Sequence, residues 1–345
     1  MKIDNKKVNE WLNNNNINYI SDFDISKRSW LKAGGVVKIY ITPKDLLELE
    51  KIINFFKFEN LKFYILGNIS NTILRDGIIL TPIINLNKID HITQINNEND
   101  LNISVGAGVS IPRFANFVMK KSYSGTEGLL GIPGSIGGGI FMNASCYGDE
   151  LTEFVTKIKS INSEGEVFTR NKNEAKFNWR DSLYQYNNEI ITDVEFLFPN
   201  KNHKNIDEIR NKSEKIKFHR KKIQENDHPN LGSLFATKNL YSEIKFISIK
   251  YFLLYLFYKF FLIIINNNLL IKMNILIFRK KINLFYRKIL NINENCDFSL
   301  SDKTINCLIN KGTQNSQNAI KLVRHLHKTF KKKIRLENII LDNIE

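Results

Sequence analysis

The chain has 345 residues, of which 43% are hydrophobic, and it carries a formal net charge of +15. The length allows two or three domains, and the hydrophobic content excludes a globally disordered chain. The charge would suit a nucleic acid, a membrane surface or a phosphorylated metabolite, but Lys, Asn and Ile are abundant throughout and no known nucleic-acid-binding signature accompanies them, so we expect no nucleic-acid partner.

Cysteine usage and the first residues indicate the compartment. Cys146, Cys296 and Cys307 have no metal-ligand spacing and cannot form an even disulfide framework, so we predict no metal site and a reducing environment. Residues 1–7 contain no apolar stretch of the kind found in secretory signals. We therefore expect a cytoplasmic protein.

Hydrophobic spacing predicts alternating helices and strands in the first quarter of the chain. Val8, Trp11 and Leu12 form an apolar helical stripe, and the residues before Pro43 are rich in β-branched side chains. The elements expected here are a helix over 5–20, a strand over 36–42, an amphipathic helix over 44–58, and strands over 61–66 and 77–84.

The remaining pattern continues in the same way and predicts an α+β protein with mixed sheets. Pro112 stands in the first turn of one expected helix, a position that proline favours. The expected strands cover 101–105, 157–163, 167–169 and 190–198, and the expected helices cover 111–121, 205–225 and 316–333.

A glycine-rich stretch over residues 125–148 is the most informative part of the sequence. Its glycines are Gly125, Gly128, Gly131, Gly134, Gly137, Gly138, Gly139 and Gly148. Each interior glycine costs a helix or strand about 0.5–1 kcal/mol relative to alanine, so we expect a loop here. Backbone N–H groups in such a loop can converge on an anion, which suggests a phosphate-bearing cofactor. A solvated linker is disfavoured because Ile132, Ile136 and Phe141 are apolar.

This stretch matches neither a Walker loop nor a Rossmann fingerprint, but it resembles the flavin loop of the UDP-N-acetylenolpyruvoylglucosamine reductase (UDP-N-acetylmuramate dehydrogenase) family. The matching positions are Gly131, Ile132, Pro133, Gly134, Gly137, Gly138, Asn143, Tyr147 and Gly148. The resemblance implies that these residues from Gly131 to Tyr147, together with Ser135 inside the same loop, bind FAD.

A second cofactor segment is implied by the turn that follows the strand at 61–66. It reads Gly67, Asn68, Ile69, Ser70, Asn71 and Thr72. In the family a similar turn meets the pyrophosphate, with glycine often at the position of Asn68. Without the resemblance, a polar hairpin turn would be the preferred interpretation.

The resemblance implies three catalytic residues. Arg180 lies in a family-like Arg-Asp-Ser motif in which Trp179 replaces the usual tyrosine, and Ser233 lies in a Gly-Ser-x-Phe motif as the implied proton donor. Glu337 keeps the family's spacing from Phe330 and Ile334, although Asn338 replaces the usual valine. A surface arginine and a solvated terminal glutamate are the alternatives.

Residues 246–289 form an apolar and aromatic insert that interrupts the resemblance. The stretch 246–265 just reaches the length of a membrane span, but Lys250 and Lys259 interrupt it, and 271–289 is studded with Lys and Arg. A buried helix pair is the preferred interpretation, and an amphipathic hairpin on a membrane surface is the alternative.

The implied fold is a flavin-binding domain of the vanillyl-alcohol-oxidase (PCMH) type with a smaller α+β substrate domain. We expect two flavin-binding subdomains, 1–72 and 73–199, and a substrate-binding domain, 200–345, in a monomer. The implied activity is NADPH-dependent reduction of the enolpyruvyl group of a UDP-sugar in peptidoglycan precursor synthesis, which serves cell-wall biogenesis, cell shape and division. The alternatives are a paralogue acting on another sugar nucleotide and a flavin-free binding module.

Overall fold

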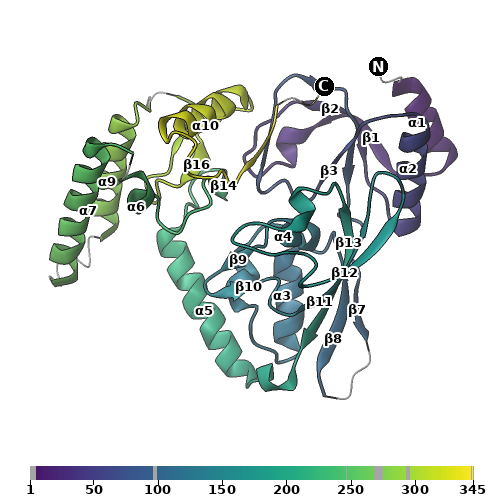
Figure 1. Cartoon of the computed structure of the whole chain (residues 1–345), viewed down its shortest axis with the longest axis horizontal. Helices are drawn as coiled ribbons and strands as arrows, with labels where there is room; N and C mark the ends of the chain where they lie inside the picture. Colours follow the sequence, from purple (N-terminus) through teal and green to yellow (C-terminus); the bar gives the residue numbers. More distant parts are fainter. Residues whose placement is uncertain are drawn as a thin grey trace.

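The computed structural model describes residues 5–95, 99–245, 247–267, 275–292, 296–342 and 344. Helices and short sheets alternate along the chain, as the α+β prediction required. Figure 1 shows an N-terminal group of elements around β1–β3, a second group around β8 and β11–β13, and a C-terminal group that carries α6, α7, α9 and α10.

The first sheet has the order β1-β2-β6-β3, with β5 also paired to β2. β1 is antiparallel to β2, whereas β6 is parallel to both β2 and β3. The elements of this part are α1 (Asn5–Asn14), β1 (Tyr19–Asp24), the 3-10 helix η1 (Ile25–Lys27), β2 (Val36–Ile41), α2 (Leu46–Phe58), β3 (Tyr64–Leu66), β4 (Thr72–Leu74), β5 (Ile78–Ile79) and β6 (Ile83–Asn85).

Two sequence predictions in this part are wrong in their bounds. The helix expected over 5–20 ends at Asn14, because Asn16 adopts a left-handed conformation (φ 53°) and Ile17 bonds back to Leu12. The residues after it form β1 instead. The strand expected over 77–84 is two strands, β5 and β6, and Pro82, which lacks an N–H donor, lies between them.

The second sheet has the order β12-β11-β13-β8-β7, and each neighbouring pair is antiparallel. Its elements and the helices beside it are β7 (Ile92–Ile95), β8 (Leu101–Gly106), α3 (Ile111–Lys120), η2 (Glu127–Gly131), α4 (Ile136–Phe141), β9 (Ser145–Cys146), β10 (Asp149–Glu150), β11 (Val155–Ile161), β12 (Val167–Asn171), η3 (Leu183–Gln185) and β13 (Ile190–Phe198). β7 was not predicted.

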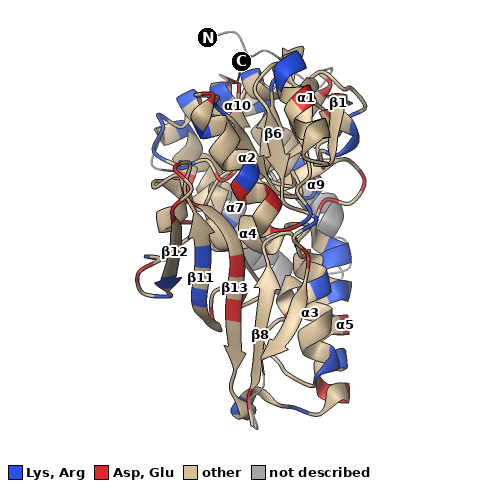
Figure 2. Ribbon diagram, turned by 90° about the vertical axis from the view of Figure 1, so that its right-hand side faces the viewer, with Lys and Arg blue, Asp and Glu red and all other residues tan. Residues whose placement is uncertain are grey.

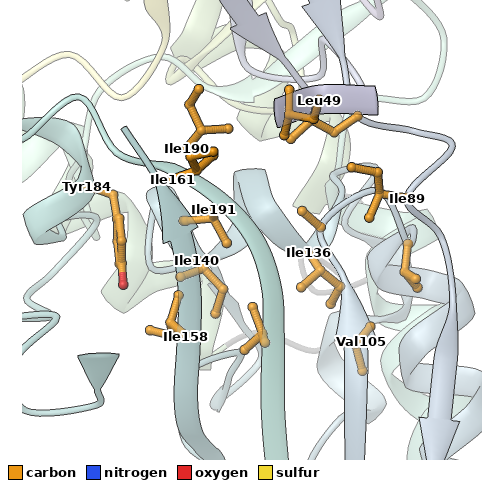
Figure 3. Packing of buried hydrophobic residues seen from close by; sticks show 14 of the residues in the cluster. Leu49, Ile89, Val105, Ile136, Ile140, Ile158, Ile161, Tyr184, Ile190 and Ile191 are labelled. Atoms are coloured by element: carbon orange, nitrogen blue, oxygen red, sulfur yellow. The ribbon is translucent and has the colours of Figure 1, made fainter. Parts of the chain in front are cut away.

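The glycines Gly137, Gly138 and Gly139 lie in the short helix α4, so the expectation of a loop is wrong for these residues. The cost of glycine in a helix is offset by close packing. A Cβ at Gly137 would lie 3.0 Å from the Cβ of Ala107, and one at Gly139 would lie 2.4 Å from Leu151. Figure 3 shows Ile136 and Ile140 of α4 among Ile158, Ile191 and Val105 of the sheet. Small residues let the helix approach the sheet closely.

The C-terminal part contains a three-stranded sheet, β14-β16-β15, and a core of its own. Its elements are η4 (Asn200–Asn202), α5 (Ile206–Ile223), β14 (Asn230–Ser233), α6 (Leu240–Ile244), α7 (Ile249–Asn267), α9 (Ile275–Ile289), β15 (Phe298–Leu300), β16 (Cys307–Asn310), α10 (Gln317–Thr329) and β17 (Ile339–Leu341). β17 leaves this part and pairs in parallel with β4, so the last strand returns to the N-terminal group.

The apolar insert contains α7 and α9, while residues 246 and 268–274 of it lie outside the described residues. Tyr251 and Leu254 of α7 are buried in the same core cluster as Tyr286 and Leu290. Several other apolar residues of α7 are exposed. The helix pair is therefore buried on one side only. Among the described residues, no helix combines the length and apolarity needed to cross a lipid bilayer.

Candidate active site

A cavity of about 1210 Å³ lies where the parts of the chain meet. The turn after β3, the loop before α4, the segment around Arg180, β14 and the start of β17 all contribute to its wall. Its lining includes all of residues 67–72, residues 131–135 with Gly137 and Gly138, and the three predicted catalytic residues. The structure thus brings together residues that are far apart in the sequence.

The turn at residues 67–72 presents a row of backbone donors to this cavity. Among the described residues, the N–H groups of 68–71 have no hydrogen-bond partner. Ile69 has a left-handed conformation (φ 52°). Where right- and left-handed backbone conformations alternate in successive residues, their N–H groups can point into one concavity that binds an anion. The turn can therefore bind an anionic group such as a diphosphate.

The turn is held against the glycine loop by close contacts. A Cβ at Gly67 would lie 2.5 Å from Ser135 Oγ, so a side chain at this position would displace the Ser135 hydroxyl. Asn68 Nδ2 donates a hydrogen bond to the carbonyl oxygen of Pro133 at 3.1 Å. Asn68, which stands where the family often has glycine, thus joins the two predicted cofactor segments.

The glycine loop itself offers fewer free donors than the sequence suggested. Ser135 caps α4, with its Oγ accepting a hydrogen bond from Gly138 N at 3.4 Å. The N–H groups of Ile136 and Gly137 donate to Val109 and Ala107. Only Gly134 and Ser135 keep N–H groups without a partner among the described residues of the stretch 132–138. These two donors lie on the cavity wall.

Asn143 and Tyr147, two predicted cofactor residues, are not part of the cavity lining. The Asn143 amide donates to the carbonyl oxygen of Asn178 at 2.9 Å and accepts from the Thr152 hydroxyl. Tyr147 contacts His219 of α5 through its hydroxyl, at 3.2 Å. Both have left-handed backbones (φ 44° and 53°). In this structure they shape the chain beside the site.

Arg180 and Glu337 form an ion pair inside the cavity. The distance from Arg180 Nε to Glu337 Oε1 is 3.0 Å, and the side chains are only 16% and 15% exposed. Arg180 Nη2 also donates to the carbonyl oxygen of Ser145 at 2.9 Å. Burial raises the pKa of Glu337, while the positive charges of Arg180 and Arg335 oppose that rise. Neither residue is the solvated surface group that remained as an alternative.

Ser233 ends β14 and lines the same cavity. Its hydroxyl has no hydrogen-bond partner among the described residues, so it is free to bond a ligand. The neighbouring Leu234 carbonyl accepts a hydrogen bond from Glu337 N at 2.9 Å, which places the Ser233 and Glu337 segments side by side.

Asn71 and Asn338 connect the cofactor turn to these residues. Asn71 Nδ2 donates to the carbonyl oxygen of Glu337 at 2.8 Å. Asn338 Nδ2 donates to Asn71 Oδ1 at 2.7 Å and to the carbonyl oxygen of Ser233 at 3.1 Å. The side-chain amide of Asn71, a predicted cofactor residue, thus holds the C-terminal segment.

Arg335 is a functional candidate that the sequence analysis missed. Its Nη2 donates to the carbonyl oxygens of both Trp179 and Arg180, each at 2.7 Å, and its Nη1 lies 3.4 Å from Asp181 Oδ1. No motif in the sequence indicated this role, because the contacts of Arg335 join segments about 155 residues apart.

The charge of the chain is spread over many elements, α5 among them (Figure 2). At the site, Arg220 of α5 lies directly over the glycine loop, since a Cβ at Gly131 would fall 1.5 Å from Arg220 Nη1. Lys212 of the same helix pairs with buried Glu127 and Asp149, whose carboxylates accept from Gly125 N and Gly128 N. Helix α5 therefore supports the base of the glycine loop.

The residues present fit a flavin dinucleotide. The free N–H groups at 68–71 and those of Gly134 and Ser135, on the wall of the same cavity, suit a diphosphate, and the cavity is large enough for an extended ligand. At two glycines of these segments a side chain would collide with a neighbour: Gly67 with Ser135, and Gly131 with Arg220.

Comparisons with known proteins agree with this geometry. Residues 37–171 match a family described as an FAD binding domain. The chain is 29% identical over 216 residues to UDP-N-acetylenolpyruvoylglucosamine reductase from Clostridium novyi (63% of this chain, 68% of the relative), and 29% identical over 207 residues to that from Streptococcus pneumoniae (60% and 66%). The matched part thus spans about two thirds of these relatives.

The fold is also found in a solved structure. UDP-N-acetylenolpyruvylglucosamine reductase from Thermus caldophilus superposes with a TM-score of 0.64 at 19% identity, over 94% of this chain and 98% of that one. The predicted fold, an α+β protein with an FAD-binding domain, is confirmed. The chain is therefore similar to UDP-N-acetylenolpyruvoylglucosamine reductases over about 60% of its length, and the FAD binding domain identifies it as an FAD-dependent oxidoreductase.

Proposed function

We propose that this protein reduces the enolpyruvyl group of UDP-N-acetylglucosamine enolpyruvate to give UDP-N-acetylmuramate, with NADPH as the reductant. The observation that carries the proposal is the cavity whose lining contains the Arg180–Glu337 pair, Ser233 and the predicted cofactor segments. The similarity to these reductases supports the choice of substrate. The protein would act as a monomer in the cytoplasm, in peptidoglycan precursor synthesis.

Bound FAD would supply the chemistry of hydride transfer, from the nicotinamide to the substrate carbon distal to the carboxylate. The remaining requirements fall to the protein. Negative charge develops on the enolate conjugated with the substrate carboxylate, and a buried guanidinium such as that of Arg180 stabilises such charge. Because Arg180 is held by Ser145 and Glu337, it needs little reorganisation during the reaction.

Ser233 would complete the reduction by donating its hydroxyl proton to the carbon next to the carboxylate, so that one hydride and one proton are added across the double bond. The hydroxyl has no competing partner among the described residues. Glu337, which is paired with Arg180, would act with it to stabilise the enolate by charge and hydrogen bonding.

The direct test follows the two half-reactions separately. We expect Ser233→Ala to leave flavin bleaching by NADPH intact and to block reoxidation by the enolpyruvyl sugar nucleotide, measured by anaerobic stopped-flow absorbance. Ser248→Ala, which changes an exposed serine outside the cavity, should keep both steps. Normal reoxidation in Ser233→Ala would refute the serine role. A colourless protein that does not take up FAD would refute the enzyme proposal and favour the flavin-free module.

One observation favours the second candidate, a paralogue acting on another sugar nucleotide. Trp179 and the segment after Ser233 are both departures from the family pattern, and they meet in space, with Lys238 Nζ 5.2 Å from the centre of the Trp179 ring. Arg180 also lies over this ring, at 5.2 Å. A changed contact beside Arg180 could alter which sugar is accepted. Bleaching by NADPH without recovery on addition of the enolpyruvyl sugar nucleotide would support the paralogue.

A further inference from the structure

The insert around α7 and α9 has an unusual charge composition. Residues 245–292 contain nine Lys or Arg and no Asp or Glu, whereas the whole chain has 35 acidic residues among 345. Lys280, Lys281 and Lys288 of α9 and both lysines of α7 are exposed. The surface of this segment is therefore cationic without the interspersed acids that soluble surfaces usually carry.

α7 also has an apolar face that the protein does not cover. Ile249, Phe252, Leu253, Leu256 and Phe260 are all exposed, from 39% for Phe252 to 74% for Ile249. Their spacing of three, four, seven and eleven residues places them on one side of a helix with 3.6 residues per turn. By the same geometry, Lys250 and Lys259 flank this apolar stripe, one on each side.

The stripe is not needed for the core of the protein. The opposite side of α7 supplies Tyr251 and Leu254 to the C-terminal core, where Tyr286 and Leu290 of α9 are also buried. A contiguous exposed apolar stripe that the core does not need points to a docking surface. Figure 1 shows α7 and α9 at the outer end of the C-terminal part, away from α4 and the sheet of β11 and β13, so a partner bound there would leave the cavity open.

We propose that α7 docks on the surface of an anionic lipid bilayer, with its apolar stripe in the headgroup region and its lysines on the lipid phosphates. An apolar face flanked by cations is the pattern of interfacial helices, in which lysine stems extend along the apolar surface and their charges reach the headgroups. No described helix can span the bilayer, so the helix lies in the interface.

Charge complementarity selects this occupant over a second copy of the chain. Two copies meeting through this face would bring the exposed Lys250 and Lys259 of both copies together without an acid in either segment, and like charges at an interface oppose association. An anionic bilayer supplies the opposite charge in excess and adapts to the shape of the exposed aromatic side chains.

The test is co-sedimentation of the full-length protein with vesicles of phosphatidylglycerol and phosphatidylcholine, compared with vesicles of phosphatidylcholine alone. We expect binding to the anionic vesicles that weakens as salt is raised. Leu253→Ser/Leu256→Ser/Phe260→Ser should lower the partition coefficient at least about tenfold. Lys250→Gln and Lys259→Gln should each lower it about fivefold.

The matched control is Phe58→Ser/Phe218→Ser, which removes two aromatic side chains that are 86% and 75% exposed on other helices. This variant should bind the vesicles as the wild type does. Absence of binding to anionic vesicles, or an equal loss in the control, would overturn the proposal. A dimer in lipid-free sedimentation that the triple variant abolishes would identify a second copy as the occupant. Flavin absorbance and circular dichroism are recorded for each variant. They show whether a loss of vesicle binding comes from the changed helix surface or from loss of the cofactor site or of the fold.

Discussion

Arg335 provides the sharpest test of how the site is held together, because it joins the C-terminal segment to the loop that carries Arg180. Its guanidinium donates to the carbonyl oxygens of Trp179 and Arg180, each at 2.7 Å. Arg180 itself has a left-handed backbone (φ 54°), a conformation that costs a non-glycine residue about 1–3 kcal/mol and persists only when its surroundings hold it. Arg335 is therefore a positioning residue for Arg180.

The size of the effect follows from these two hydrogen bonds. A hydrogen bond from a charged donor contributes about 1.5–3 kcal/mol, but Arg335 is 42% exposed, so solvent would replace part of this in a truncated variant. We expect Arg335→Ala to cost about 1–2 kcal/mol in positioning Arg180, which corresponds to a decrease of about 5–30-fold in the rate of flavin reoxidation. Arg335→Lys should recover only part of this rate, because an ammonium cannot reproduce the planar fork.

The assay is anaerobic stopped flow on the reduced protein, with the enolpyruvyl sugar nucleotide as oxidant. Reduction by NADPH should be unchanged in Arg335→Ala, since the residue is not part of the cavity lining. Arg335 also lowers the pKa of Glu337, so the variant should shift the pH profile of reoxidation upward, which a purely structural defect would not do. Arg324→Ala, which removes a surface partner of Asp342, is the control. An unchanged reoxidation rate in Arg335→Ala would refute the positioning role.

Two further predictions concern the cofactor turn and the buried carboxylate. Gly67→Ala would displace Ser135 Oγ, which lies 2.5 Å from the added Cβ and caps α4. We expect the affinity for FAD, measured by fluorescence titration, to fall about fivefold. Adding Ser135→Ala to this variant should change the affinity little further. Burial raises the pKa of Glu337 above its ordinary 4.5, so the folded state holds this proton more tightly than the unfolded state and loses stability as pH rises through the folded pKa. The unfolding free energy of Glu337→Gln minus that of the wild type, measured with urea, should therefore be more positive at pH 7 than at pH 4. An equal difference at the two pH values would contradict the raised pKa.

From the sequence, the residues of the site could be predicted more accurately than the helices and strands around them. The Gly131–Gly138 pattern, Arg180, Ser233 and Glu337 could be identified because each matches a spacing that is specific to one family. The structure places all of them on one cavity. Their assignment as cofactor and catalytic groups stays a prediction until the half-reactions are measured.

Several elements could not be predicted because their signals are weak or tertiary. β7 reads Ile-Thr-Gln-Ile, an exposed edge strand that the neighbouring β8 defines by pairing. The end of α1 depends on Asn16 adopting positive φ, which asparagine tolerates but does not require. The helix α4 forms although glycine has a low helix propensity. Its glycines pack against Ala107 and Leu151, which lie outside the helix in the sequence, and a Cβ would be too close to them.

Asn338 shows why a departure from a family pattern can carry information of its own. Valine stands at this position in the family, and a valine side chain could make none of the bonds that Asn338 Nδ2 donates to Asn71 Oδ1 and to the Ser233 carbonyl oxygen. Ile339 N adds a bond to the Asn71 carbonyl at 2.9 Å, where β17 begins its parallel pairing with β4. The turn at residues 67–72, Ser233 and Glu337 thus share one hydrogen-bonded junction. Because the N–H groups of residues 68–71 are still free, an anion that orders this turn would also order Asn71, and through Asn338 the Ser233 strand. In this chain, anion binding at the turn and the placement of Ser233, the predicted proton donor, are therefore expected to be coupled.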